Sequence, residues 1–130
     1  MRFNVNSWNI AIGSIAILLA MRVGFEAARV IPRRTLVGLA ELEPEKNHQP
    51  LLKSGIYSQT RNPIYFTHWL LILAAANLSG YVANWTLFGL DAILHPLMIR
   101  AEEKELLERY GAEFEAYMRE VPRFFPKWPW

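Results

Sequence analysis

The chain has 130 residues, of which 52% are hydrophobic and 20% charged, and its net charge is +2. This length is typical of one domain, and so small a charge without a basic patch excludes a nucleic-acid-binding protein. The lack of cysteine excludes disulfides, thiolate nucleophiles and zinc–thiolate sites. No charged residue occurs in 3–21, and Asp91 is the only one in 62–99. A small soluble domain cannot easily bury so much continuous apolar sequence, whereas membrane spans use it.

The first predicted helix covers about residues 7–30. A basic Arg2 before an apolar run is also typical of a signal peptide. However, several Asn residues make the start polar, and no clean small-x-small cleavage pattern ends the run, so we interpret it as a retained membrane span. Pro32 stops this helix, and a polar connector follows over 33–53.

Two more membrane helices are predicted at about 63–78 and 82–99, and Pro63 is typical of a helix start. A helix over 100–120 continues beyond the membrane, and Gly111 interrupts it. The expected fold is therefore all-α, an integral membrane protein with about three transmembrane helices and a cytosolic C-terminal helix. We expect residues 1–130 to form a single domain.

Basic residues predict the orientation. The turn at 79–84 has none, whereas the connector and the tail after 99 are rich in Arg and Lys. The positive-inside rule then places connector and tail in the cytosol, with the N-terminus and the turn outside an inner or plasma membrane. The polar segments on either side of the hairpin would meet on the cytosolic face.

Glu102 and Glu103 are the first functional candidates. Glu103 shares an apolar helix stripe with Leu106 and Leu107, so its carboxylate must pair, accept hydrogen bonds or stay protonated. The simpler alternative is a solvated helix surface. In the polar stretch before Pro63, Arg61 and free backbone N–H groups could hold an anion, or Arg61 could merely snorkel to the membrane surface.

Three ionisable residues, His68, Asp91 and His95, lie within the predicted spans, which makes each a functional candidate. Asp91 and His95 are four residues apart, so they can pair along one helix face. A structural pair is the alternative. A metal site would need His68 as a third ligand, and no metal is predicted.

Two stretches carry a family resemblance. They are Leu51–Tyr65, which includes Gly-Ile-Tyr and Arg-Asn-Pro-Ile-Tyr, and, about forty residues later, Ile99–Tyr117 with Glu-Glu, Tyr-Gly, Phe and Tyr. Together they resemble the isoprenylcysteine carboxyl methyltransferase superfamily, which includes phospholipid methyltransferases. The resemblance covers roughly residues 50–126. Asn62 stands where many relatives have His, and Thr67 where Gly often follows.

This resemblance implies methyl transfer from S-adenosylmethionine within the membrane. The residues matching the family's cofactor pocket are Tyr57, Arg61, Asn62, Tyr65, Glu102, Glu103 and Tyr110. Glu103 and Arg123 are expected at the reaction centre, with Arg123 as an anchor for an anionic acceptor. The expected acceptor is lipid-like or otherwise apolar, with a carboxylate, amine or thiol at the cytosolic interface, and membrane lipids are the expected surroundings. Oligomer formation is left open.

Two other functions are compatible with the same residues. One is a non-catalytic membrane accessory subunit that keeps the fold. The other is a related membrane reductase that uses a nicotinamide cofactor. Binding of a reduced nicotinamide would favour the reductase, and binding of S-adenosylmethionine without any methyl transfer would favour the accessory subunit.

Overall fold

A computed structural model describes residues 1–32 and 50–127. Helix α1 covers Ser7–Val30, the short 3-10 helix η2 Gly55–Ser58, α4 Pro63–Leu78, α5 Val82–Tyr110 and α6 Ala112–Glu120. The predicted all-helical fold is confirmed. Helix α5 continues unbroken past residue 99 to Tyr110, in agreement with the predicted continuation of the helix beyond the membrane, and Gly111 separates it from α6 as expected.

Local sequence explains where the helices begin and end. Asn6 and Asn9 form a reciprocal capping box at the start of α1, which satisfies backbone N–H groups that have no partner within the helix. Pro63 begins α4, where a missing N–H costs nothing. Gly80, with φ +69°, forms the turn to α5.

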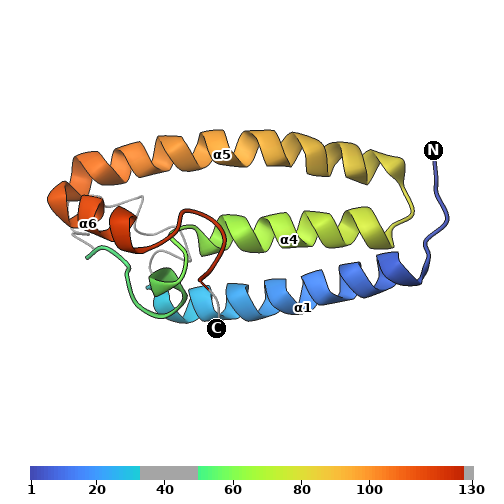
Figure 1. Cartoon of the computed structure of the whole chain (residues 1–130), viewed down its shortest axis with the longest axis horizontal. Coiled ribbons are helices and arrows are strands. Elements are labelled where there is room, and N and C mark those ends of the chain that lie inside the picture. Colours follow the sequence, from blue (N-terminus) through green and yellow to red (C-terminus); the bar gives the residue numbers. More distant parts are fainter. Residues whose placement is uncertain (33–49, 128–130) are drawn as a thin grey trace.

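The three long helices lie side by side, with α4 between α1 and α5 (Figure 1). Small side chains on α1 allow α4 to approach closely. A Cβ at Gly13 would lie only 2.4 Å from Cγ of Leu78 on α4. The buried core between the two helices consists of Ala16, Ala20, Val23 and Ala27 of α1 with Ile56, Phe66, Leu70 and Ala74.

Large apolar side chains cover the outer faces of α1 and α5. Examples are Ile15 and Leu18 on α1 and Ile93 and Leu97 on α5, all more than half exposed. Both helices are long and apolar enough to cross a membrane, while α4 is a shorter apolar helix of 16 residues, or about 24 Å. Such extensive apolar surface fits lipid surroundings better than water.

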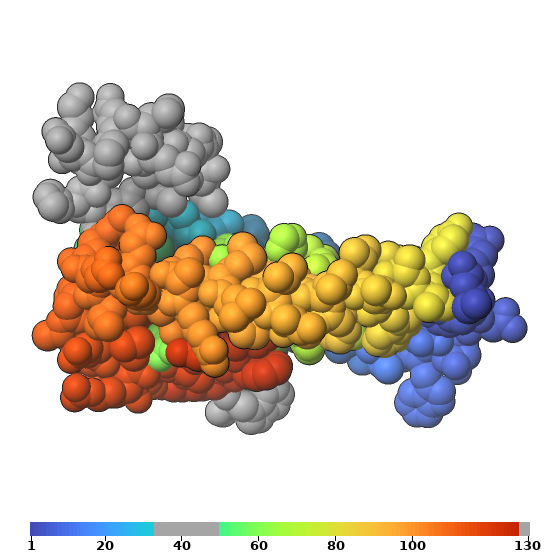
Figure 2. Space-filling model, turned by 90° about the horizontal axis from the view of Figure 1, so that it is seen from above, coloured from blue at the N-terminus to red at the C-terminus, as the bar shows by residue number. Residues whose placement is uncertain are grey.

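Polar structure gathers at one end of this elongated body. Gly111 ends α5 with φ +54°, and α6 folds back from it. The following segment 121–127 then returns beside the start of α4 (Figure 1). Seen from above, α6 and this C-terminal segment occupy the end of the molecule opposite the N-terminus (Figure 2). At the N-terminal end, the Phe3 N–H donates to the Gly80 carbonyl at 2.8 Å.

Candidate functional site

The loop between η2 and α4 binds the C-terminal segment. The Arg61 backbone N–H donates to the Pro122 carbonyl at 3.0 Å. Its guanidinium donates to the carbonyls of Met118 at 2.8 Å and Val121 at 3.1 Å. Arg61 therefore satisfies carbonyl groups at the end of α6 that have no helical partner.

Thr60 and Asn62 continue the same contact. The Thr60 hydroxyl donates to the Phe124 carbonyl at 2.8 Å, and the Asn62 side-chain amide donates to the Arg123 carbonyl at 2.8 Å. Both side chains are buried. Successive carbonyls of the C-terminal segment are thus each bonded by the loop, which fixes the path of that segment.

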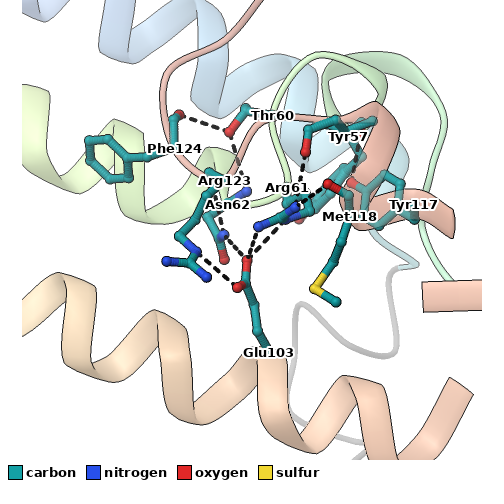
Figure 3. Close-up of polar contacts among 10 residues, drawn as sticks. Tyr57, Thr60, Arg61, Asn62, Glu103, Tyr117, Met118, Arg123 and Phe124 are labelled. Atoms are coloured by element: carbon teal, nitrogen blue, oxygen red, sulfur yellow. Dashed lines mark hydrogen bonds and ion pairs between the residues drawn. The ribbon is translucent and has the colours of Figure 1, made fainter. Parts of the chain in front are cut away.

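Glu103 on α5 is the centre of the network (Figure 3). One carboxylate oxygen accepts from Arg61, with Nε at 3.0 Å and Nη2 at 2.9 Å, and from the Asn62 amide at 3.3 Å. The other oxygen accepts from Nε of Arg123 at 2.9 Å. Glu103 is 6% exposed, so the alternative of a solvated helix surface is wrong, and of the three outcomes open to a buried carboxylate this one is paired and hydrogen-bonded. Both oxygens are occupied by protein donors.

Glu102 behaves differently from its neighbour. Its side chain is exposed, and one oxygen accepts from the Tyr65 hydroxyl at 2.5 Å. This pair connects the start of α4 to α5 next to the Glu103 network. Neither Tyr65 nor Glu102 lines the cavity between the loop, α5 and α6, so this hydrogen bond stabilises the site without forming part of its wall.

A cavity of about 210 Å³ lies between the loop, α5 and α6. Much of its wall is apolar, but it also contains charged and amide side chains, and it is called the polar cavity here for these groups. Five of the seven residues expected in a cofactor pocket line it. They are Tyr57, Arg61, Asn62, Glu103 and Tyr110, joined by residues that were not among those expected in the pocket, Pro50, Leu51, Leu52, Leu106, Arg109, Phe114 and Tyr117. The position of Tyr117 along the helix gives no sign of a polar role at this cavity.

Two of the tyrosines that line this cavity, Tyr57 and Tyr117, remain protonated at neutral pH. Burial raises the pKa of Tyr57 to about 12, and the nearby Glu102 carboxylate adds to the effect. Burial also raises the pKa of Tyr117. The Tyr117 hydroxyl donates to the Tyr57 carbonyl at 2.6 Å, which ties α6 to η2.

A second, apolar cavity of about 280 Å³ lies on the other side of the network. Aromatic rings dominate its wall, with Phe124 packed edge-on against Trp69 at 6.0 Å between ring centroids. Its lining residues are Trp69, Ala92, His95, Pro96, Ile99, Arg123, Phe124 and Phe125. The aromatic members could not be assigned to a cavity from sequence, because they come from two distant segments.

One bond separates the two cavities. Glu103 lines the polar cavity, Arg123 lines the apolar cavity, and their side chains are joined at 2.9 Å. The Arg123 side chain is 47% exposed, whereas that of Glu103 is 7% exposed. The network is therefore a charged partition between a polar and an apolar space.

Asp91 and His95 form the expected pair on α5, with Oδ2 and Nδ1 2.9 Å apart. The His68 ring centroid lies 5.9 Å from that of His95. Within residues 1–32 and 50–127, no group of three His, Asp or Glu side chains is arranged to hold a metal ion.

Comparison with known proteins defines the class. The sequence model of the phospholipid methyltransferase family matches residues 8–113, which include α1, the loop, the hairpin and Glu103. The chain belongs to this family, whose enzymes are grouped with the isoprenylcysteine-type membrane methyltransferases, so the predicted family is confirmed.

Two curated relatives are similar to part of the chain. The nickel-cobalt-cadmium resistance protein NccN of Alcaligenes xylosoxydans xylosoxydans is 32% identical over 78 residues, 59% of this chain and 36% of the relative. The cobalt-zinc-cadmium resistance protein CzcN of Cupriavidus metallidurans is 32% identical over 83 residues, 63% of this chain and 38% of the relative. The matched part thus spans little more than a third of each relative.

The chemistry of the polar cavity fits S-adenosylmethionine. Tyrosine rings can face a sulfonium through cation–π contact, and Arg109 can pair with the ligand's carboxylate. The described cavity is smaller than the ~300 Å³ typical of ligand pockets, so part of the ligand would lie at its open side. The Glu103 oxygens would have to exchange a protein donor to bind it directly.

Proposed function

We propose that the protein transfers a methyl group from S-adenosylmethionine to an apolar acceptor, at the end of the bundle where α4 begins. The observation that carries this proposal is the partition. A polar cavity with aromatic and charged walls and an apolar cavity meet at the Glu103–Arg123 bond. A methyltransferase with a charged cosubstrate and a lipid-like acceptor needs two such compartments side by side.

The bound cosubstrate supplies an electrophilic methyl group. The protein aligns and desolvates the reactants, which are the main requirements of a direct displacement. Tyr57, Tyr110 and Arg109 provide rings and charge on the polar side, while Trp69 and Phe124 exclude water on the apolar side. The Arg61–Glu103 pair fixes the position of the polar cavity relative to Arg123 in the wall of the apolar cavity.

Acceptor access and topology belong to the same proposal. The apolar cavity is open, and its wall includes Ala92 and Pro96 from the helix with the most exposed apolar surface. An acceptor would therefore reach it from the lipid. The basic connector and tail support a cytosolic position for this end of the bundle.

Cofactor binding is the first test. We expect the detergent-solubilised protein to bind S-adenosylmethionine with a Kd in the micromolar range by calorimetry. Tyr110→Ala and Arg109→Ala should weaken binding about tenfold or more, because both side chains line the polar cavity. Arg119→Ala is the matched control, since Arg119 lies on the exposed face of α6 and pairs only loosely with Glu115 at 3.8 Å. No heat at saturating ligand would reject the proposal.

Transfer is the second test. A radiolabelled-methyl assay on a total lipid extract should give a labelled apolar product, whose identification defines the acceptor. The filled Glu103 oxygens favour a second candidate, a non-catalytic accessory protein that keeps the fold. Cosubstrate binding without a labelled product from any lipid extract or small acceptor would favour that candidate.

A further inference from the structure

The Asp91–His95 pair borders the apolar cavity, and the motif does not include it. His95 is 5% exposed and contributes to the cavity wall together with Trp69, Phe124 and Arg123. Its Nδ1 lies 2.9 Å from Oδ2 of Asp91. Among the described residues, neither of these buried atoms makes a hydrogen bond, so the short approach of the carboxylate to the ring is an ion-pair contact.

This contact defines the state of the imidazole. A carboxylate oxygen 2.9 Å from Nδ1 favours the ring proton on that nitrogen, which leaves Nε2 as the basic atom. No residue in 1–32 or 50–127 donates a hydrogen bond to Nε2. The other ionisable groups around the ring are Tyr65, at 5.0 Å between ring centroids, His68, at 5.9 Å, and Arg123 on the same cavity wall.

Building on the proposed function, we propose that His95 is the proton acceptor for the methyl acceptor, and that this acceptor is an apolar thiol. The thiol S–H bond breaks, its proton moves to Nε2 of His95, and the electron pair stays on the sulfur, which becomes the nucleophile. Asp91 positions the imidazole and stabilises its positive charge. No oxidant or reductant is required.

The charges at the cavity favour a thiol over the two other acceptor classes. A neutral thiol loses little hydration on moving into an apolar space, whereas a carboxylate or ammonium loses much. After proton transfer, the thiolate lies in a cavity with Arg123, and the imidazolium lies beside Asp91. An ammonium would face Arg123, a like charge, and a carboxylate carries no proton for His95 to remove.

The kinetic test compares three acceptors of equal chain length, decanethiol, decylamine and decanoate, with wild-type protein and His95→Gln. We expect the thiol to be the preferred wild-type acceptor. His95→Gln should lower its methylation at neutral pH by about 10²–10⁴-fold, the usual contribution of a general base. The variant's rate should then rise tenfold per pH unit as the thiol ionises unaided. His68→Gln is the control and should retain the wild-type rate, since His68 is exposed and does not line this cavity.

Imidazole NMR gives a readout without cosubstrate. The chain has three histidines, so ¹⁵N-histidine labelling yields few signals. We expect one histidine in the Nδ1–H form in wild type, absent in His95→Gln and converted to a tautomer mixture in Asp91→Asn. If His95→Gln folds poorly, the tautomer change in Asp91→Asn still tests whether Asp91 sets the position of the ring proton. An Nε2–H signal for His95 would overturn the proposal.

The outcomes separate this inference from the proposed function. A protein that binds no S-adenosylmethionine fails both. A protein that methylates decanoate or decylamine better than decanethiol keeps the proposed function and overturns the thiol assignment. Equal loss on all acceptors in His95→Gln, without a changed pH profile, would make His95 structural and overturn the proton transfer.

Discussion

Arg61 and Glu103 form an ion pair of 2.9 Å in which both side chains are less than a tenth exposed. The two residues are 42 positions apart, and the hairpin of α4 and α5 brings them together. Burying two charges is costly unless they are paired and their remaining hydrogen-bonding groups are satisfied. Here Met118, Val121, Asn62 and Arg123 complete the pairing, so the energy of the network depends on all its members.

Glu103→Ala should destabilise the protein strongly, because it leaves the buried Arg61 guanidinium without a countercharge. Removing one partner of a buried pair costs about 3–5 kcal/mol. Thermal unfolding in detergent micelles measures the loss. Glu115→Ala is the matched control, because the Glu115–Arg119 pair is exposed and should contribute at most about 1 kcal/mol. Equal stability of the two variants would contradict the conclusion that Glu103 stabilises the buried network.

Thr60→Val should loosen the C-terminal segment. The change removes the hydroxyl that donates to the Phe124 carbonyl and accepts from the Asn62 backbone N–H. Leaving buried polar groups unpaired costs about 1–3 kcal/mol. We expect faster tryptic cleavage after Arg123, measured by mass spectrometry, while Thr60→Ser keeps the hydroxyl and the wild-type rate. Unchanged cleavage in the valine variant would show that the other loop contacts suffice.

Gly111→Ala should destabilise α6, whereas Gly89→Ala should not. Gly111 has φ +54° and ψ −126°, a conformation that side chains rarely adopt, although no atom would touch an added Cβ. Backbone strain of this kind costs about 1–3 kcal/mol. An added Cβ at Gly89, inside α5, also meets nothing, so alanine there should be neutral or stabilising by up to ~1 kcal/mol. Unfolding midpoints of the two variants should therefore move in opposite directions or by clearly different amounts.

Alkaline pH should destabilise the folded protein partly through Tyr57. The pKa of Tyr57 is about 12 in the folded chain, against 10.0 for an ordinary tyrosine. Between pH 10 and 12 the unfolded chain loses a proton that the folded chain keeps, so stability falls as pH rises through this window and is intact below it. Denaturation curves from pH 9 to 12 should show a weaker fall in Tyr57→Phe. The exposed Tyr81→Phe is the control, and a fall identical to wild type in Tyr57→Phe would contradict the assignment.

Much of the fold could be predicted from sequence because its signals are local. Apolar runs bounded by Asn6, Pro32, Pro63 and Gly80 mark the helices, and the ends of α1 and α4 agree with the predicted ranges. Position 103 on an apolar stripe limits a buried carboxylate to pairing, accepting hydrogen bonds or staying protonated, but the stripe alone does not exclude a solvated helix surface. The uncharged run ends at Ile99, which marks the expected end of the membrane span, and the expected helix continues past it as part of α5.

The rest of the site depends on contacts that have no local signal. The sequence predicted that Arg61 could bind an anion, but it did not identify the Glu103 carboxylate as that anion. A guanidinium can pair equally with a carboxylate of the protein or with a bound ligand. Tyr65 and Glu102 match the family motif yet lie outside the cavity and bond each other. The apolar cavity arises only when Phe124 returns to Trp69, a consequence of backbone contacts at Thr60 and Asn62.

The loop holds the C-terminal segment by its main chain: residues 60–62 bond the carbonyls of Val121, Pro122, Arg123 and Phe124. The side chains of Phe124 and Phe125 take no part in that attachment and face the apolar cavity. Under the proposed function, substitutions at these two positions would alter the acceptor cavity directly, while the hydrogen bonds to the segment's carbonyls do not depend on these side chains. Acceptor choice and cosubstrate binding could then change independently, because different side chains line the two cavities.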